Sequence, residues 1–386
     1  MKKIAIIGAN KPLLPFYKQA KALGYYIVGI AWEEGAVCRE YCDKFYPVSF
    51  KEKNQVLEVC REEKIDGITS FSLESALPTV VYVAQSLGLT GNTAECVELT
   101  RTKYNQRKAF ERAGINVPRF YKVSDNDELN GIELDTPLIV KPIDSGGSQG
   151  ITLVRAIDGL KKAYISAQKL SPAREVIIEE YVDGREFSVE CLSYKGEHYL
   201  VQITDKVTTG EPHFVELQHH QPANISLHLT QRIKAMVFKA LDALKIENSP
   251  SHTEIKLNSR GELFIIEIGA RLGGGMITSD LVRLSTGYDL VKAAIELACG
   301  IFIKPTVLEA AFSGILFYSE KTPEIGEVIK HHDIYPEIVE CEITEGEMKK
   351  LKSNADRMGF VIYRSLERKI DMNYLGETPM GGGILP

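Results

Sequence analysis

Two glutamates on neighbouring apolar segments could hold a divalent cation. Glu254 and Glu267 flank Asn258-Ser259-Arg260-Gly261, a turn-forming run that predicts a β-hairpin. If the loop has an even number of residues, Glu254 lies opposite Ile265, and Glu267 lies diagonally beside Glu254 on the same face. Mg²⁺ usually takes one or two carboxylates together with substrate phosphates. A metal site is favoured over two solvent-facing acids, because isoleucines surround Glu267 and an unpaired charge there would be unfavourable.

Arg271 follows closely and could bind an anion. It lies four residues after Glu267 and precedes Gly273-Gly274-Gly275. The forked guanidinium group suits a γ-phosphate or a substrate carboxylate. An isolated arginine is more often a surface residue, so it is the nearness of the two glutamates that favours a role in the site.

A lysine at the end of an apolar strand is followed by a loop of small residues. Lys141 precedes the run Asp144-Ser145-Gly146-Gly147-Ser148-Gln149-Gly150. Glycines let backbone N–H groups approach phosphate oxygens, and a lysine supplies a point charge, although the Walker spacing is absent. The alternative is a plain hairpin turn with a surface lysine. The predicted polyphosphate contacts of the loop are Ser145, Gly146, Gly147, Ser148 and Gly150.

Cysteines and histidines do not favour a zinc site. The seven cysteines are scattered without a Cys-x-x-Cys pair, so neither a disulfide framework nor a zinc knuckle is indicated. His213, His219 and His220 form a cluster, but no second acid or cysteine stands at ligand spacing.

The order of apolar segments predicts the elements that position these residues. In the first hundred residues, strand-like runs alternate with helix-like stretches, which is the β-α-β order of a parallel sheet. A helix capped by Thr100 or Thr102 ends near Arg112 and opens a second unit of strands and hairpins in an α+β pattern. The last part returns to strands, with one charged helix near residues 345–356.

The composition is that of an ordinary globular enzyme. Hydrophobic residues make up 44% of the 386 residues, and the net charge of -6 gives no general attraction to nucleic acid or anionic lipid. No apolar stretch approaches the roughly 18 residues that span a bilayer, and the first apolar run is too short for a secretory signal. We therefore expect a cytoplasmic protein that acts on small molecules, without nucleic-acid or membrane partners.

In order and spacing, these features resemble the ATP-grasp superfamily. The resemblance covers most of the chain and includes the helix at Lys103, the Lys141 loop, the run Glu179-Glu180-Tyr181-Val182, Glu186, and the set Glu254, Glu267 and Arg271. It implies an ATP-grasp fold that combines α/β and α+β parts. The expected parts are an N-terminal parallel-sheet domain (1–100), an ATP-grasp domain (101–304) with a lid subdomain at about 117–182, and a C-terminal α+β region with a tail (305–386).

The resemblance also assigns nucleotide contacts. The two phosphate-binding lysines of the family fall on Lys103 and Lys141, and the glycine-rich loop closes over the triphosphate. The ribose contact falls on Glu186. The adenine contacts fall on Glu179, Glu180 and Val182.

The implied cofactors are ATP and Mg²⁺, with Mn²⁺ as an alternative metal. The last metal segment of the family usually reads Glu-x-Asn-x-Arg, and here Gly269 stands where the asparagine is expected. Glu254 and Glu267 remain as metal ligands, and the number of metal ions stays open.

Residues 214–222, 266–274 and 354–362 are similar to the branch that contains L-amino acid ligases and carbamoyl-phosphate-synthetase-like proteins. In dipeptide-forming members, a glutamate and a histidine three residues later line the substrate pocket, and these fall on Glu216 and His219. We expect both on an irregular stretch before Pro222. The resemblance implies a ligase that joins a small carboxylic acid to an amine through an acyl phosphate, with ADP and phosphate as products. The predicted catalytic residues are Arg271, Glu216 and His219. Both substrates stay unidentified, and a homodimer, common among relatives, stays open.

Three other functions are alternatives to this ligase. A nicotinamide oxidoreductase is disfavoured, because the turn Gly8-Ala9-Asn10-Lys11-Pro12-Leu13 lacks the second and third glycines of the dinucleotide fingerprint. The other two are a carbamoyl-phosphate-synthetase-like ligase with a nucleophile other than an amine, and an ATP-binding sensor or subunit without turnover. ADP release that depends on an added acid would separate an enzyme from a sensor.

Overall fold

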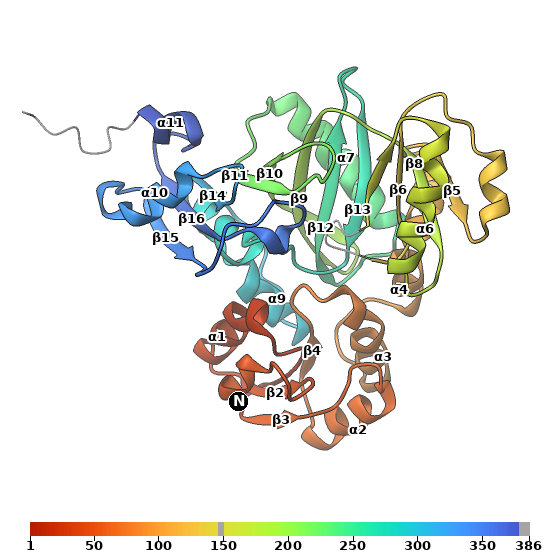
Figure 1. Cartoon of the computed structure of the whole chain (residues 1–386). Coiled ribbons are helices and arrows are strands. Elements are labelled where there is room, and N and C mark those ends of the chain that lie inside the picture. Colours follow the sequence, from red (N-terminus) through yellow and green to blue (C-terminus); the bar gives the residue numbers. More distant parts are fainter. Residues whose placement is uncertain (146–149, 378–386) are drawn as a thin grey trace, which may run out of the picture.

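The computed structural model describes residues 1–145 and 150–377. Gly146, Gly147 and Ser148 of the predicted phosphate loop lie outside the described residues, as does the glycine-rich tail. The described residues form three sheets, which we call the N-terminal, small and large sheets (Figure 1). In this described part, no helix combines the length and apolar character needed to cross a membrane.

The N-terminal sheet is parallel, as the alternation of strands and helices predicts. In spatial order its strands are β3 (Lys44–Tyr46), β2 (Tyr26–Ile30), β1 (Lys3–Ile7) and β4 (Gly67–Thr69). The helices that cover it are α1 (Leu14–Ala22), α2 (Lys53–Glu63), α3 (Leu77–Leu87) and, from much later in the chain, α9 (Leu290–Ala298). Alternate side chains of β1 point to opposite cores, one shared with α1 and α9 and the other with α2 and α3. Helix α9 therefore ties the N-terminal sheet to the rest of the molecule (Figure 1).

The small sheet is antiparallel. In spatial order its strands are β5 (Phe120–Val123), β8 (Val176–Glu180), β6 (Leu138–Pro142) and β7 (Thr152–Val154). Helix α6 (Leu160–Leu170) covers one face and packs against Val140 and Ile178. Because side chains alternate along a strand, Lys141 and Glu179 point to the opposite face.

The large sheet is also antiparallel and occupies the centre of the molecule (Figure 1). In spatial order its strands are β13 (Leu263–Gly269), β12 (Ser249–Leu257), β9 (Arg185–Tyr194), β10 (Glu197–Thr208), β11 (Glu216–Gln221), β14 (Phe312–Tyr318), β16 (Gly359–Ser365) and β15 (Ile338–Ile343). Helix α7 (Leu227–Ala243) packs against the apolar residues of β9, β12 and β13. The alternate residues of β9 and β12, which are mostly polar, face the other way.

The remaining helices are α4 (Ala94–Thr100), α5 (Lys103–Arg112), α8 (Val282–Thr286), α10 (Glu324–Lys330) and α11 (Met372–Glu377). Of the two caps predicted for α5, Thr102 is the one formed, since its hydroxyl accepts a hydrogen bond from the backbone N–H of Asn105 at 3.1 Å. This cap places Lys103 in the first turn of the helix.

Three local predictions are wrong. The charged helix near 345–356 is a short 3₁₀ turn, Asn354–Asp356, because the segment has too few apolar side chains to bury a helical face. Glu216 and His219, expected on an irregular stretch, lie on strand β11. Glu254 lies opposite Glu267 rather than Ile265, because Leu257 pairs with Leu263 and an irregularity beyond Ile255 shifts the register.

The turn between β8 and β9 depends on Gly184. Its φ is +94°, and a Cβ atom there would lie 2.1 Å from the carbonyl oxygen of Leu257. Gly196 also has a positive φ, of +78°, but its Cβ position is open. We expect Gly184→Ala to lower the melting temperature more than Gly196→Ala, for which the left-handed backbone alone costs about 1 kcal/mol. Scanning calorimetry of both variants tests this, and equal shifts would contradict the constraint at Leu257.

Candidate active site

A pocket lies between the small sheet and the large sheet. Its apolar walls include Ile139 of β6, Ile266 of β13 and Phe214, and its carboxylates include Glu186 of β9 and Glu254 of β12. An apolar slot with a few polar groups at its edge suits a planar aromatic ring that is joined to a group with hydroxyls.

The residues predicted to hold adenine border this pocket. Glu180 and Val182 line it, and Nζ of Lys256 donates to the carbonyl oxygen of Val182 at 3.3 Å. The same ammonium group lies 5.3 Å from the ring centroid of Tyr181. These contacts hold the chain after β8 against β12.

Glu179 is buried between two cations. Its carboxylate accepts a hydrogen bond from Nε of Arg107 at 2.6 Å and lies 2.5 Å from Nζ of Lys141. Burial would raise the pKa of Glu179, but Arg107 and Lys141 outweigh it and lower the pKa to about 2. Because both oxygens are engaged, the side chain of Glu179 positions Lys141, and the predicted contact with adenine is left to its backbone.

Lys103 joins the described part of the predicted phosphate loop to one of the carboxylates predicted to bind metal. Its Nζ donates to Oε1 of Glu267 at 2.9 Å and to the carbonyl oxygen of Ser145 at 2.8 Å. Lys103, Lys141, Ser145, Glu254 and Glu267 all line one cavity. Glu216 and Arg271 line the same cavity, so the structure brings together seven of the predicted site residues.

Glu254 and Glu267 are suited to a hard divalent cation. They are direct cross-strand partners on β12 and β13, and both line this cavity. Across the described ranges 1–145 and 150–377, no three His, Cys, Asp or Glu side chains form a metal-holding group. Two carboxylates fit Mg²⁺, which takes its other ligands from phosphates and water.

Comparison with known proteins identifies this arrangement. Residues 134–280 match the ATP-grasp domain family. The crystal structure of an L-amino acid ligase from Bacillus licheniformis has the same fold, with a TM-score of 0.79 at 22% identity over 95% of this chain and 94% of that chain. The chain has an ATP-grasp fold. The fold predicted from the sequence is thereby confirmed.

Two curated relatives are similar to this chain over most of its length. The alanine–anticapsin ligase of Bacillus subtilis is 26% identical over 269 residues, which cover 64% of this chain and 56% of the relative. The carbamoyl phosphate synthase large chain of Campylobacter jejuni is 24% identical over 302 residues, which cover 73% of this chain and 27% of the relative. The chain thus spans about half of the first relative's length and about a quarter of the second's.

The candidate site contains a buried lysine that was not predicted from the sequence. Nζ of Lys206, on β10, lies 3.1 Å from Glu186, 2.9 Å from Glu216 and 2.9 Å from Glu254. Burial would lower the pKa of Lys206, but the three carboxylates raise it well above its usual value. The only local sign is a lysine within a strand, since the three acids come together only through the order of β9, β10, β11 and β12.

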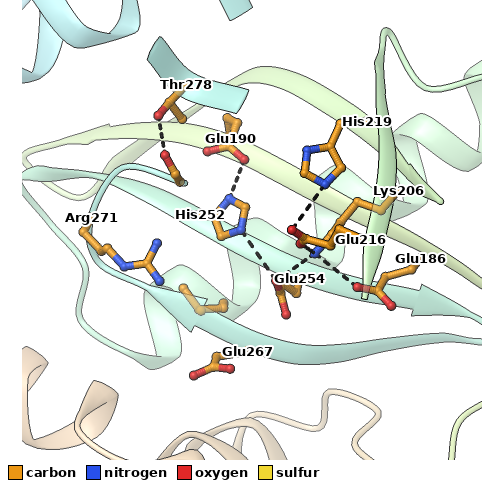
Figure 2. A network of polar contacts seen from close by, with 12 residues as sticks. Glu186, Glu190, Lys206, Glu216, His219, His252, Glu254, Glu267, Arg271 and Thr278 are labelled. Atoms are coloured by element: carbon orange, nitrogen blue, oxygen red, sulfur yellow. Dashed lines mark hydrogen bonds and ion pairs between the residues drawn. The ribbon is translucent and has the colours of Figure 1, made fainter. Parts of the chain in front are cut away.

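A histidine and a glutamate form a second buried pair beside Glu254. Figure 2 shows Glu190, His252 and Glu254 in a row, with Nδ1 of His252 2.6 Å from Glu190 and Nε2 3.8 Å from Glu254. Burial would lower the pKa of His252, but Glu190 raises it, to about 9. Gly273 packs onto the ring so closely that a Cβ would lie 2.5 Å from Nδ1. Nothing in the local sequence signals this pair, because the two residues meet only by strand pairing.

Glu216 and His219 lie together, and a C-terminal segment contacts them. Nε2 of His219 is 3.6 Å from Oε2 of Glu216, to which Nδ2 of Asn354 donates at 3.1 Å. Arg357 stacks on an aromatic ring and places Nη1 3.7 Å from the same oxygen. Burial opposes ionisation, but Lys206 and His219 lower the pKa of Glu216 well below its usual value. Asn354 and Arg357 were not predicted as site residues.

The other two histidines of the predicted cluster point elsewhere. Nδ1 of His220 lies 2.9 Å from the hydroxyl of Tyr363, on the opposite face of the strand, and His213 lines a separate cavity. The three histidines therefore do not converge on one point.

Arg271 faces an acid from the N-terminal part of the chain. Its Nη2 lies 3.6 Å from Oε2 of Glu74. Burial and the negative charge of Glu267 raise the pKa of Glu74. Glu74, Lys103, Glu267 and Arg271 line a cavity of about 440 Å³. Glu74 was not predicted either, because it follows β4 in the N-terminal domain, where the sequence indicates no site residue.

Glu179 should make stability depend on pH. Its folded pKa of about 2 lies below the ordinary 4.5, so its stabilisation is complete above pH 4.5 and is lost as the pH falls toward 2. We expect Glu179→Gln to lower the melting temperature at about pH 7. The difference in melting temperature between this variant and the wild type should become smaller as the pH falls from about 6 to about 3. Glu58→Gln, on the exposed side of α2, is the matched control. A gap that stays constant with pH would contradict the buried ion pairs.

Proposed function

We propose that the protein is an ATP-dependent carboxylate–amine ligase that releases ADP and phosphate through an acyl phosphate. The observation that carries this proposal is the single cavity lined by Lys103, Lys141, Glu254, Glu267 and Arg271. Phosphoryl transfer is catalysed mainly by positioning and by fixed charges around the transferred group. Support also comes from the relatives named as an alanine–anticapsin ligase and an L-amino acid ligase.

In this proposal the nucleotide bridges the two sheets. The base occupies the apolar pocket beside Glu180 and Val182, and Glu186 takes the ribose. The phosphates then extend toward Lys141, Lys103 and the loop that begins at Ser145. At the other end of this loop, Gly150 has a φ of +72°, a conformation that favours glycine.

Glu254 and Glu267 would hold Mg²⁺, with Mn²⁺ as a substitute. When bound, the metal neutralises charge on the phosphates during transfer. The protein groups that remain fixed throughout are Lys103, paired with the half-buried Glu267, and Lys141, paired with the buried Glu179.

An amino acid is the substrate acid that the charges favour. A guanidinium group binds a carboxylate through paired hydrogen bonds, and a neighbouring carboxylate binds an ammonium group. Arg271 and Glu74 place these two complementary charges 3.6 Å apart on the wall of one cavity. Leu77 and Pro78 of the same cavity supply apolar surface for a side chain.

The amine would reach the acyl carbon from the side of Glu216. An ionised carboxylate attracts an ammonium group, and an uncharged imidazole can accept the proton that the amine must lose. Within the described part of the chain, neither ring nitrogen of His219 has a hydrogen-bond partner, although the ring is buried next to Glu216. This arrangement leaves His219 available as a base.

The acyl phosphate can be trapped. With ATP, Mg²⁺ and the correct amino acid, hydroxylamine should give a hydroxamate and an equal amount of ADP, because it attacks the activated carboxyl carbon. A panel of amino acids and dicarboxylic acids, assayed for phosphate release, identifies the acid. AMP and pyrophosphate as products would refute the acyl phosphate, and bound ATP without turnover on any acid would favour a sensor.

Glu267→Gln should reduce turnover by roughly a hundredfold or more while the fold is kept. The substitution removes a charge that the metal requires and leaves Lys103 without its carboxylate partner. Glu262→Gln, in the exposed turn of the same hairpin, is the matched control. Steady-state kinetics and circular dichroism of both variants test this, and near-normal turnover of Glu267→Gln would remove this residue from the mechanism.

A further inference from the structure

Each of the two proposed metal carboxylates has one oxygen bound by a buried lysine. Oε1 of Glu254 accepts from Lys206, and Oε1 of Glu267 accepts from Lys103, both at 2.9 Å. Nε2 of His252 also lies nearest Oε1 of Glu254, at 3.8 Å. Within the described residues, no hydrogen bond is formed by Oε2 of Glu254 or of Glu267, so each carboxylate keeps one oxygen for a metal.

Lys206 is saturated by the acids around it. An ammonium group has three N–H donors, and Lys206 contacts three carboxylates, those of Glu186, Glu216 and Glu254. Only 2% of its side chain is exposed. Figure 2 shows Lys206 among Glu186, Glu216 and Glu254. The three carboxylates therefore fix the position of the ammonium group. Its positive charge lies against Glu254, on the side away from Glu267.

Among the described residues that line the cavity of Glu254 and Glu267, the other carboxylates are Glu74 and Glu216. Each already faces a cation, Arg271 at 3.6 Å from Glu74 and Lys206 at 2.9 Å from Glu216. Gly269 has no side chain, and a Cβ there would lie 3.1 Å from Nε of Arg271, so the guanidinium group occupies the adjacent space. Asn354 lines the cavity, but both ends of its amide bind Glu216, through Nδ2 at 3.1 Å and Oδ1 at 3.3 Å. A second dication next to Glu254 would meet the charge of Lys206 without an oxygen to hold it.

We propose that this site takes one divalent cation per nucleotide, and that Lys206 is a positioning residue that supplies in fixed form the positive charge of a second cation. The inference rests on the proposed function, since it requires a metal–nucleotide complex at Glu254 and Glu267. It extends that function by assigning Lys206 the task of joining the metal, ribose and amine subsites. Without Lys206, Glu186, Glu216 and Glu254 would form a cluster of acids open to a second dication.

Counting bound Mn²⁺ tests the proposal. The full chain is mixed with one equivalent of a non-hydrolysable ATP analogue and titrated with MnCl₂, and free Mn²⁺ is measured by its electron paramagnetic resonance signal. Equilibrium dialysis of the analogue gives its occupancy separately. We expect one Mn²⁺ per chain for the wild type and for Lys206→Arg, which keeps the charge, and two for Lys206→Met.

The outcomes separate the inference from the function beneath it. Two Mn²⁺ ions in the nucleotide-bound wild type would overturn the inference, even if Lys206→Met failed to fold. A folded Lys206→Met variant that binds nucleotide but still takes one Mn²⁺ would overturn the role of Lys206. If the analogue does not bind to the wild type, the proposed function fails first.

Discussion

Carboxylates buried on the open face of the large sheet must be matched by fixed cations, and this requirement organises the whole site. A buried carboxylate without a partner is strongly unfavourable, and removing one member of a buried pair is far more harmful than never having formed it. Lys206 meets the requirement for three acids at once, and His252 meets it for Glu190. The cations come from interior strands, so the sheet must form in this order for the charges to balance.

The same pairing ties distant parts of the chain together. Helix α5 supplies Lys103 to Glu267 of the large sheet and Arg107 to Glu179 of the small sheet. The C-terminal segment reaches back through Asn354, and the N-terminal part reaches in through Glu74. The polar face of the large sheet is thus surrounded by groups from every part of the fold, which leaves a cavity lined by charges of both signs.

Sequence reasoning succeeds where the chemistry is local. The neighbouring sequence indicates Lys141 at a strand end and the two glutamates of one hairpin. The structure brings all three into one cavity. The register within that hairpin was wrong because an irregularity near Ile255 cannot be seen in the spacing. Lys206 and His252 were not predicted for a different reason. Each contacts its carboxylate partners only because strands distant in the sequence pair in the sheet.

The central claim is that Glu254 and Glu267 together hold the metal of a bound nucleotide. A crystal structure of the protein with ADP and MnCl₂, with anomalous diffraction measured for manganese, tests it most directly. We predict an anomalous peak within coordination distance of both carboxylates and of a phosphate oxygen, with the base beside Val182. A manganese peak that touches neither glutamate, in a crystal where ADP is bound, would contradict the account.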